Sequence, residues 1–253
     1  MARLGELALT AAAARPSEVA LDIGCGAGGT TLALARVVAP TGHVLGLDLS
    51  AAMALEATQR AAAAGITNVR FAAGDASTYA FDPGTADLLF SRFGVMFFGD
   101  PASAFGNMRG ALRRGGRVVF LCWRAFKENP WAAVPFMAGA PLLPQQPRPG
   151  PDEPGPFSFA DPARVTRILS AAAFDQVTIE PVDIQVALSS GDLDEAVAQV
   201  TEAGPLSRAL QDAAPDVRAQ VLDAVRGALL PYRSADGIRL AAACWLVRAI
   251  NPG

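Results

Sequence analysis

The sequence predicts an α/β protein with a doubly wound, mostly parallel sheet covered by helices on both faces. Short apolar runs alternate with helical stretches through the first half of the chain, which is the pattern of strands joined by crossover helices. A glycine-rich turn follows the first of these runs. The chain has 253 residues, 51% of them hydrophobic, which is enough for one large α/β domain.

The first half of the chain is expected to contain five strands. They are Val19–Ile23, His43–Leu47, Val69–Ala73, Ala86–Ser91 and Arg117–Cys122. The helices expected around them are Met1–Arg15, Thr30–Val38, Ser50–Ala64 and Phe105–Leu112. Ser50 is a candidate helix cap and Gly65 a candidate helix end, and Arg113–Gly116 is expected to turn into the fifth strand.

The second half changes character at a proline-dense stretch, Asn129–Pro156, which predicts an irregular covering segment with a short helix near Trp131–Gly139. Asp161 and Pro162 have the residue types of a helix cap and first helical position, so a helix is expected from there to about Ala173. The later elements expected are strands Val177–Leu188 and Ile238–Ala249 and helices Asp192–Ala203 and Pro215–Leu230. We expect a single domain, with a core over 1–126, a proline-rich covering segment over 127–160, and a C-terminal part of the sheet with inserted cap helices over 161–253.

Composition excludes several classes of partner and chemistry. With 24 acidic and 21 basic residues, the net charge of −3 provides no positive field for nucleic acid or anionic lipid. His43 is the only histidine and Lys127 the only lysine, so histidine-based triads, Schiff bases and multi-histidine metal sites are disfavoured, and no metal is expected.

The cysteines and the first residues of the chain indicate the cellular compartment of the protein. The three cysteines are an odd number scattered among apolar segments, which favours reduced thiols. No apolar run approaches the roughly 20 residues of a membrane-spanning helix. The alanine-rich start contains Glu6 and leads directly into a strand pattern, so we expect a helix there and a cytoplasmic protein.

The strongest chemical signal is the segment from Val19 to Thr30, which reads VALDIGCGAGGT. Alternate glycines allow a sharp turn and let a ligand approach the backbone N–H groups, while the following helix N-terminus favours polar or anionic groups. Asp48 comes 20 residues after Gly28, at the end of the second strand, where a carboxylate can accept hydrogen bonds from ribose hydroxyls.

Two cofactors fit this arrangement, because the turn also matches the dinucleotide pattern G-x-G-x-x-G. Asp22, just before the glycines, would repel a pyrophosphate. The ammonium and sulfonium groups of S-adenosylmethionine would instead be attracted to this carboxylate. Asp22 therefore favours S-adenosylmethionine over a nicotinamide dinucleotide.

Five segments, in order, resemble the class I S-adenosylmethionine-dependent methyltransferases, close to the type that includes the ubiquinone/menaquinone-biosynthesis enzymes. They are Leu21–Gly28, Gly46–Ser50, Gly74–Ala76, Ala86–Ser91 and Leu112–Arg117. The resemblance implies a seven-stranded Rossmann-like sheet with an antiparallel last strand and a helical, proline-rich substrate cap. It also implies S-adenosylmethionine as cofactor and a small, apolar or aromatic methyl acceptor.

The resemblance carries a set of cofactor-binding positions, with Asp75 facing the adenine amino group. The set is Asp22, Gly24, Cys25, Gly26, Gly28, Thr30, Asp48, Leu49, Met53, Gly74, Asp75, Ala76 and Ser91. Plainer interpretations stand beside it: Asp48 and Asp75 as cap carboxylates, and Cys25 as a packing residue rather than a nucleophile. His43 lies at the opposite edge of the sheet, and no general base can be named.

The chain departs from the family in two places. Arg114 stands where family members usually have proline. Only 18 residues precede the first strand, where similar proteins often have some tens that help to close over the cofactor. The lid is therefore expected from elsewhere in the chain or from a partner subunit, or the enzyme is more open.

Candidate acceptor-binding residues follow the fourth and fifth strands. Arg92 stands among apolar residues, where an arginine needs a partner, such as a substrate carboxylate or phosphate, or Asp87. The aromatic candidates, for which core packing is the alternative, are Phe93, Phe97, Trp123 and Trp131.

Three functions remain open from the sequence. A methyltransferase acting on a small molecule is favoured over an NAD(P)-dependent oxidoreductase and over a non-catalytic partner or scaffold with a methyltransferase fold. Nucleic acid is not expected as the acceptor, because the Asn-Pro-Pro-Tyr signature of adenine methyltransferases is absent after the fourth strand. The alanine-rich helices could pack internally or form a homodimer.

Overall fold

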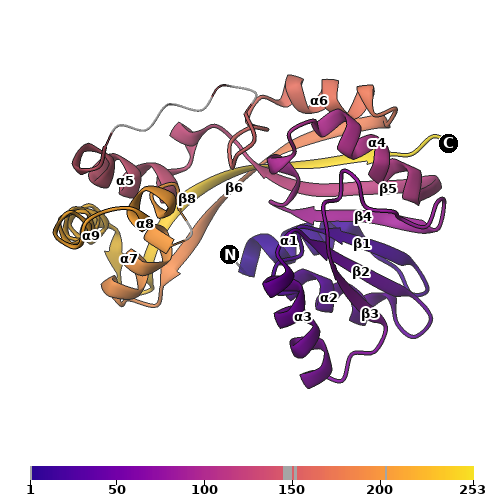
Figure 1. Ribbon diagram of the computed structural model, residues 1–253, viewed down its shortest axis with the longest axis horizontal. Helices are drawn as coiled ribbons and strands as arrows, with labels where there is room; N and C mark the ends of the chain where they lie inside the picture. The colour runs from indigo at the N-terminus through magenta and orange to yellow at the C-terminus, as the bar shows by residue number, and fades with distance from the viewer. Residues whose placement is uncertain (1, 145–149, 151–152, 203) are drawn as a thin grey trace. The chain divides into compact units, whose positions relative to one another are not determined.

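The computed structural model describes residues 2–144, 150, 153–202 and 204–253 (Figure 1). The chain divides into two compact units. The sheet unit comprises Ala2–Trp123, Glu153–Pro181 and Trp245–Gly253, and the helical unit comprises Arg124–Asp152 and Val182–Cys244. The three consecutive segments expected from the sequence, with boundaries after residues 126 and 160, stay a prediction.

The described strands form one sheet in the order β3-β2-β1-β4-β5-β8-β6, with β7 paired to β8. They are β1 (Val19–Ile23), β2 (His43–Asp48), β3 (Val69–Ala73), β4 (Ala86–Arg92), β5 (Leu112–Trp123), β6 (Asp175–Ser189), β7 (Arg233–Ser234) and β8 (Gly237–Ile250). The pairs among β1 to β5 are parallel, and the last strands are antiparallel. The expected α/β class is confirmed. The eighth strand, β7, is only two residues long and leaves no alternating pattern in the sequence.

Helices cover both faces of the sheet within the sheet unit. The helices are α1 (Ala2–Ala12), α2 (Gly29–Val38), α3 (Ala51–Ala63), α4 (Pro101–Ala111), α5 (Pro130–Gly139), α6 (Pro162–Ala171), α7 (Leu193–Glu202), α8 (Ser207–Gln211) and α9 (Pro215–Leu229). Helices α1, α2 and α3 pack on one face, and α4 packs against β5 and α6 on the other. None of the helices in the described part of the chain is both long and apolar enough to cross a bilayer.

Short 3-10 helices join several of these elements. They are η1 (Val95–Phe97), η2 (Phe126–Glu128), η3 (Ala140–Leu142) and η4 (Leu230–Tyr232). The helix expected near Trp131–Gly139 is present as α5. The expected helix end at Ala203 and part of the proline-rich segment, residues 145–149 and 151–152, lie outside the described residues.

Capping chemistry explains where several helices begin. Ser50 accepts a hydrogen bond from the N–H of Met53, and Asp161 caps α6, both as expected. Helix α4, however, begins at Pro101, four residues before the expected start at Phe105. The carboxylate of Asp100 accepts a hydrogen bond from the N–H of Ser103, so Asp100 and Pro101 form the cap and first position of this helix.

The expected turn at Arg113–Gly116 lies inside β5 rather than before it. Ala86 of β4 pairs with Leu112 and Leu88 pairs with Arg117, so two steps along β4 match five along β5. Gly115 takes up part of the excess with a φ of 75°. The glycines therefore form an irregularity within a paired strand, where extra residues on one strand bend it as in a β-bulge.

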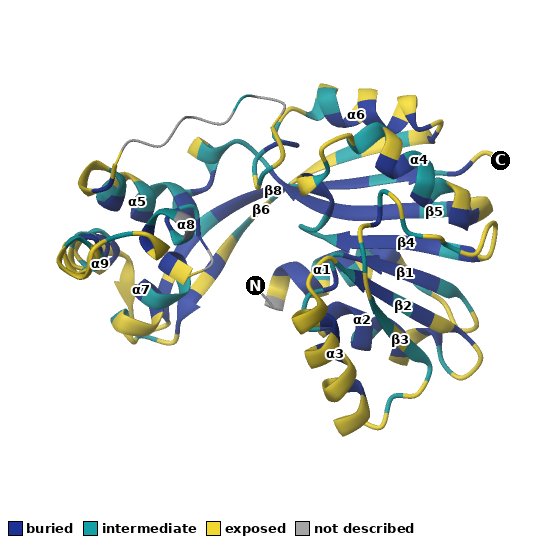
Figure 2. Cartoon of the chain, viewed as in Figure 1, coloured by how far each residue is buried: buried dark blue, intermediate teal, exposed yellow. Residues whose placement is uncertain are grey.

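The core of the sheet unit lies around the central strands, which Figure 2 shows as the most deeply buried. At the amino end of the sheet, Arg117 of β5 anchors α1. Its guanidinium donates to both carboxylate oxygens of Glu18 and to the carbonyl oxygens of Ala12 and Ala13. These carbonyls end a helix and would otherwise lack partners, so the arginine fixes α1 against β5.

Candidate functional site

The glycine-rich turn after β1 depends on left-handed backbone at Gly24, Gly26 and Gly28, with φ values of 68°, 53° and 79°. The N–H groups of Gly24 and Cys25 both donate to the carbonyl oxygen of Leu47 at the end of β2. The turn is therefore held against the neighbouring strand where the expected cofactor position lies.

Asp22 is a fully buried carboxylate directly before this turn. The hydroxyls of Thr30 and Thr31, at the start of α2, donate to its Oδ2 atom at 2.9 and 2.7 Å. Its Oδ1 atom is buried and has no hydrogen-bond partner among the residues that the structure describes. Burial raises the pKa of Asp22 to about 6, against the opposing effects of the two threonine hydroxyls and the positive charge of Arg92.

Asp48, at the end of β2, holds the turn from the other side. Its Oδ2 accepts a hydrogen bond from the N–H of Gly26 at 2.7 Å, and its Oδ1 accepts one from Ser50 at 2.9 Å. An ionised carboxylate has about four acceptor sites, so both oxygens can accept further bonds. Leu49 and Met53 beside it are exposed, Leu49 by 78%, although both are apolar.

The loop after β3 adjoins Asp48, since the N–H of Gly74 donates to the backbone oxygen of Asp48. Asp75 is exposed, and the bonds that it receives from Ser77 lower its pKa. The side-chain amide of Asn107 on α4 donates to the carbonyl oxygens of Ala76 and Tyr79 and so fixes this loop.

The end of β4 is tied to the glycine-rich turn by Ser91, which is fully buried. Its hydroxyl donates to the carbonyl oxygen of Ile23 at 2.7 Å and accepts from the N–H of Gly94 at 3.1 Å. The structure therefore gives Ser91 two backbone partners that link β1 to the segment after β4. Its expected cofactor contact stays a prediction.

Arg92 lies on the same face of the sheet as Asp22. Asp22 pairs with Phe90 in the parallel register of β1 and β4, and Arg92 is two residues beyond Phe90. A Cβ atom on Gly5 of α1 would lie 3.7 Å from Nη1 of Arg92 and 3.8 Å from Thr30. Arg92 is half-buried and makes no hydrogen bond or ion pair with any residue in the described part of the chain. Asp87, the partner considered from the sequence, instead forms an ion pair with Arg113 and accepts a hydrogen bond from the N–H of Val19.

Phe93 and Trp123, after β4 and at the end of β5, form a parallel stack with ring centroids 4.0 Å apart and an angle of 5° between the rings. Phe97, on η1, is 53% exposed. Trp131 belongs to the helical unit, where its indole N–H donates to the side chain of Asn129. The structure thus brings Phe93 and Trp123 together.

Cys25 and His43 stay outside the chemistry of the turn. Burial raises the pKa of the Cys25 thiol to about 12, so the thiolate form is scarce at neutral pH. His43 is exposed and begins β2 at the amino edge of the sheet. Neither observation supplies a nucleophile or base beside the turn.

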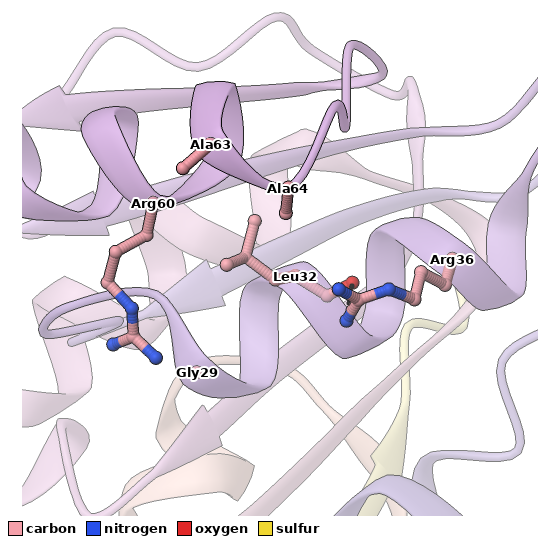
Figure 3. A pocket seen from close by; sticks show the side chains of 6 residues that line it. All are labelled: Gly29, Leu32, Arg36, Arg60, Ala63 and Ala64. Atoms are coloured by element: carbon pink, nitrogen blue, oxygen red, sulfur yellow. Dashed lines mark hydrogen bonds between the residues drawn. The ribbon is translucent and has the colours of Figure 1, made fainter.

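A groove of about 380 Å³ between α2 and α3 is lined by Gly29, Leu32, Ala63, Ala64 and two arginines (Figure 3). The arginines are Arg36 and Arg60, which donate to the carbonyl oxygens of Leu32 and Ala27. Both arginines are exposed at the helix surface. The groove therefore does not include the carboxylates at the ends of β1, β2 and β3.

Three residues of this arrangement were not predicted from the sequence. Thr31 donates to Asp22 together with Thr30, and Asn107 fixes the loop after β3. Gly94 has no side chain, which allows the backbone of Gly24 to lie close to it. Thr31 follows Thr30 directly at a helix start, so the pair was a readable signal. Nothing in the sequence pattern marks Asn107 or Gly94.

Residues 20–116 match the family model described as a methyltransferase domain. This part of the chain is therefore similar to a methyltransferase domain. The match decides between the two cofactor interpretations of the glycine pattern and confirms the resemblance stated for these strands, so the oxidoreductase alternative is dropped.

Curated relatives match about half of the chain or less. Over 128 residues the chain is 34% identical to aklanonic acid methyltransferase DauC of a Streptomyces species, covering 51% of this chain and 57% of the relative. Over 107 residues it is 36% identical to a demethylmenaquinone methyltransferase of Staphylococcus aureus, covering 42% and 44%. An uncharacterised protein in a transposon of Streptomyces fradiae is 38% identical over 111 residues, 32% of its length. The chain thus spans about a third to just over half of these relatives.

Solved structures share the fold over the whole chain. The YcgJ protein of Bacillus subtilis superposes with a TM-score of 0.65 at 17% identity, covering 99% of this chain and 98% of that one. A methyltransferase-like protein of Bacillus halodurans also gives 0.65 at 15% identity, with full coverage of both chains. At these identities the likeness extends to the fold alone.

Proposed function

We propose that the protein transfers the methyl group of S-adenosylmethionine to a small molecule. The observation that carries this proposal is the pair formed by Asp22 and Arg92 beside the glycine-rich turn of a methyltransferase domain. Asp22 has a buried carboxylate oxygen without a described partner, and the half-buried guanidinium of Arg92 has no hydrogen bond or ion pair in the described chain. Buried charges of this kind normally have partners.

The two opposite charges fit the amino-acid end of S-adenosylmethionine. That end carries an ammonium group and a carboxylate, and Asp22 and Arg92 lie on one face of the sheet under α1 and α2. A guanidinium binds a carboxylate through two parallel hydrogen bonds, while the negative charge of Asp22 favours a cation nearby. We therefore assign Arg92 to the carboxylate of the cofactor. The sequence alone had suggested that Arg92 binds the acceptor.

The remaining cofactor positions fit the adenosine end. The free lone pairs of Asp48 would accept from the ribose hydroxyls, and the exposed carboxylate of Asp75 would accept from the adenine amino group. Leu49 and Met53, exposed although apolar, would cover the adenine ring. Gly74 and Ala76 would lie along the same ligand.

S-adenosylmethionine, when bound, supplies a methyl group that is already activated by its sulfonium. The protein then has to hold donor and acceptor in line and keep water out. Neither Cys25 nor His43 is suited to be a general base for the acceptor, because the Cys25 thiol is protonated and His43 lies at the far edge. The catalytic contribution proposed here is therefore positional.

Small molecules are the proposed acceptors. The curated relatives are named for aklanonic acid and for demethylmenaquinone, and both are small molecules. The net charge of −3 disfavours nucleic acid. The three cysteines are buried and odd in number, which supports reduced thiols in a compartment such as the cytoplasm. A homodimer stays a prediction.

Calorimetry with S-adenosylhomocysteine and with NADH tests the proposal. The folded protein, checked by circular dichroism, is expected to bind S-adenosylhomocysteine and to give no heat with NADH. A folded protein that binds neither compound, or only NADH, contradicts it.

A further inference from the structure

Phe93 has a backbone conformation that aromatic residues rarely adopt. Its φ is 64°, in the left-handed region where a bulky side chain is strained by about 1–3 kcal/mol. The conformation is held on both sides, because the N–H of Phe93 donates to the carbonyl oxygen of Leu121 and the N–H of Gly94 donates to Ser91. Retained strain of this kind is typical of functional positions.

The strained backbone places the Phe93 ring flat on the indole of Trp123. The centroids are 4.0 Å apart and the planes differ by 5°. Trp123 is 4% exposed, whereas Phe93 is half-buried, so Phe93 is the outer layer of the stack. One ring face of Phe93 is taken by Trp123, and Phe93 is the more exposed of the two residues.

The stack adjoins the donor turn. Gly94, the next residue after Phe93, contacts Gly24 so closely that a Cβ atom on Gly24 would lie 2.6 Å from the Cα of Gly94. On the other side of Phe93, Arg92 approaches Asp22 and the start of α2. Phe93 therefore lies between the proposed carboxylate site and the closest contact with the glycine-rich turn.

We propose that the stack of Phe93 on Trp123 is a platform for a planar aromatic methyl acceptor, with Phe93 as the positioning residue. This inference rests on the proposed methyltransferase function. A flat ring laid on the outer face of Phe93 extends an existing parallel stack and loses little conformational freedom. A saturated, puckered ring of the same skeleton cannot make the same contact.

Two matched pairs of compounds test the platform on protein saturated with S-adenosylhomocysteine: phenol with cyclohexanol, and 2-naphthol with decahydro-2-naphthol. Binding is measured by calorimetry and by saturation-transfer NMR. The aromatic member of at least one pair is expected to bind more tightly than its saturated partner. If neither aromatic compound is preferred, the platform is wrong.

Variants locate the preference. Phe93→Leu is expected to weaken binding of the preferred aromatic compound about three- to tenfold, and to leave its saturated partner and S-adenosylhomocysteine unchanged. Phe93→Tyr, which keeps the ring, should retain the preference. Phe81→Leu is the matched control, because the ring of Phe81 packs on Tyr79 in the loop after β3.

The outcomes separate the two proposals. Equal weakening of aromatic and saturated compounds by Phe93→Leu, or the same loss in Phe81→Leu, overturns the platform while the methyltransferase function stands. Failure of the wild-type protein to bind S-adenosylhomocysteine overturns the function itself. Should the leucine variant not fold, the preference of the wild-type protein for the aromatic member of either pair decides the platform.

Discussion

Gly24 and Gly94 contact each other through their backbones, which joins the glycine-rich turn to the segment after β4. A Cβ atom on Gly94 would lie 2.5 Å from the carbonyl oxygen of Ile23 and 2.8 Å from the Cα of Gly24. Real Cβ atoms do not approach backbone so closely, so either strand end must move if Gly94 gains a side chain. The turn and the aromatic stack thus depend on one pair of glycines.

Gly94→Ala is accordingly expected to lower the free energy of unfolding by about 3 kcal/mol, as overpacking against backbone does. Urea denaturation measures the change. Gly99→Ala is the control, because no atom lies within 4 Å of the Cβ that it would add. Similar stability of the two variants would contradict the close contact.

The stability of the protein should depend on pH through Asp22. The carboxyl pKa is about 6 in the folded protein against 3.8 in a model compound, so the folded state holds this proton more tightly than the unfolded state. The contribution of Asp22 to stability is therefore full below pH 3.8 and is lost as the pH rises through 6, by about 3 kcal/mol in all.

Asp22→Asn removes this titration and serves as the reference. The difference in unfolding free energy between wild type and Asp22→Asn, measured in urea from pH 4 to pH 8, should shift against the wild type as the pH rises. Because every other carboxyl group is shared by the two proteins, their effects cancel. A difference that is constant over this range would show that Asp22 is not held protonated by burial.

Arg117→Met should loosen α1. Arg117 is the partner of the carbonyl oxygens of Ala12 and Ala13 and of both oxygens of Glu18, so its loss leaves helix-end carbonyls unpaired. We expect a loss of about 2 kcal/mol in stability. Hydrogen exchange over residues 2–12 should also be faster.

Arg113→Met is the matched control for the α1 anchor, because Arg113 pairs with Asp87 through a side chain that is 53% exposed. Its effect on stability should be within about 1 kcal/mol, with exchange in α1 unchanged. Equal effects of the two variants would remove the special role assigned to Arg117.

Local signals in the sequence were sufficient for most of the sheet, and the failures have physical causes. The strand Val19–Ile23 was predicted with its observed bounds because it is an apolar run, interrupted only by Asp22, that ends directly before glycines. The Asp-Pro pair at Asp161 was used to predict a helix start, whereas the same pair at Asp100 was not. Helix α8 was missed, because five residues are too few to show helical periodicity.

Some residues of the candidate site could be predicted from the sequence, and others could not. Residues that act through type and spacing, such as Asp22, Asp48 and the glycines of the turn, could be named from the sequence. The unpaired state of Arg92, the left-handed backbone of Phe93 and the contact of Gly94 with Gly24 depend on which strands are neighbours and on exact register. These are long-range relationships, and no local pattern encodes them.

The most direct test of the account compares the affinities of S-adenosylhomocysteine and 5′-methylthioadenosine for the wild type and for Arg92→Met, by calorimetry. The two ligands share the adenosine end, and only the first carries the amino-acid end assigned to Asp22 and Arg92. Arg92→Met should weaken S-adenosylhomocysteine about tenfold or more, the loss of a charge-assisted bond, and leave 5′-methylthioadenosine within about twofold. Unchanged affinity for S-adenosylhomocysteine, or an equal loss for both ligands, would contradict the assignment.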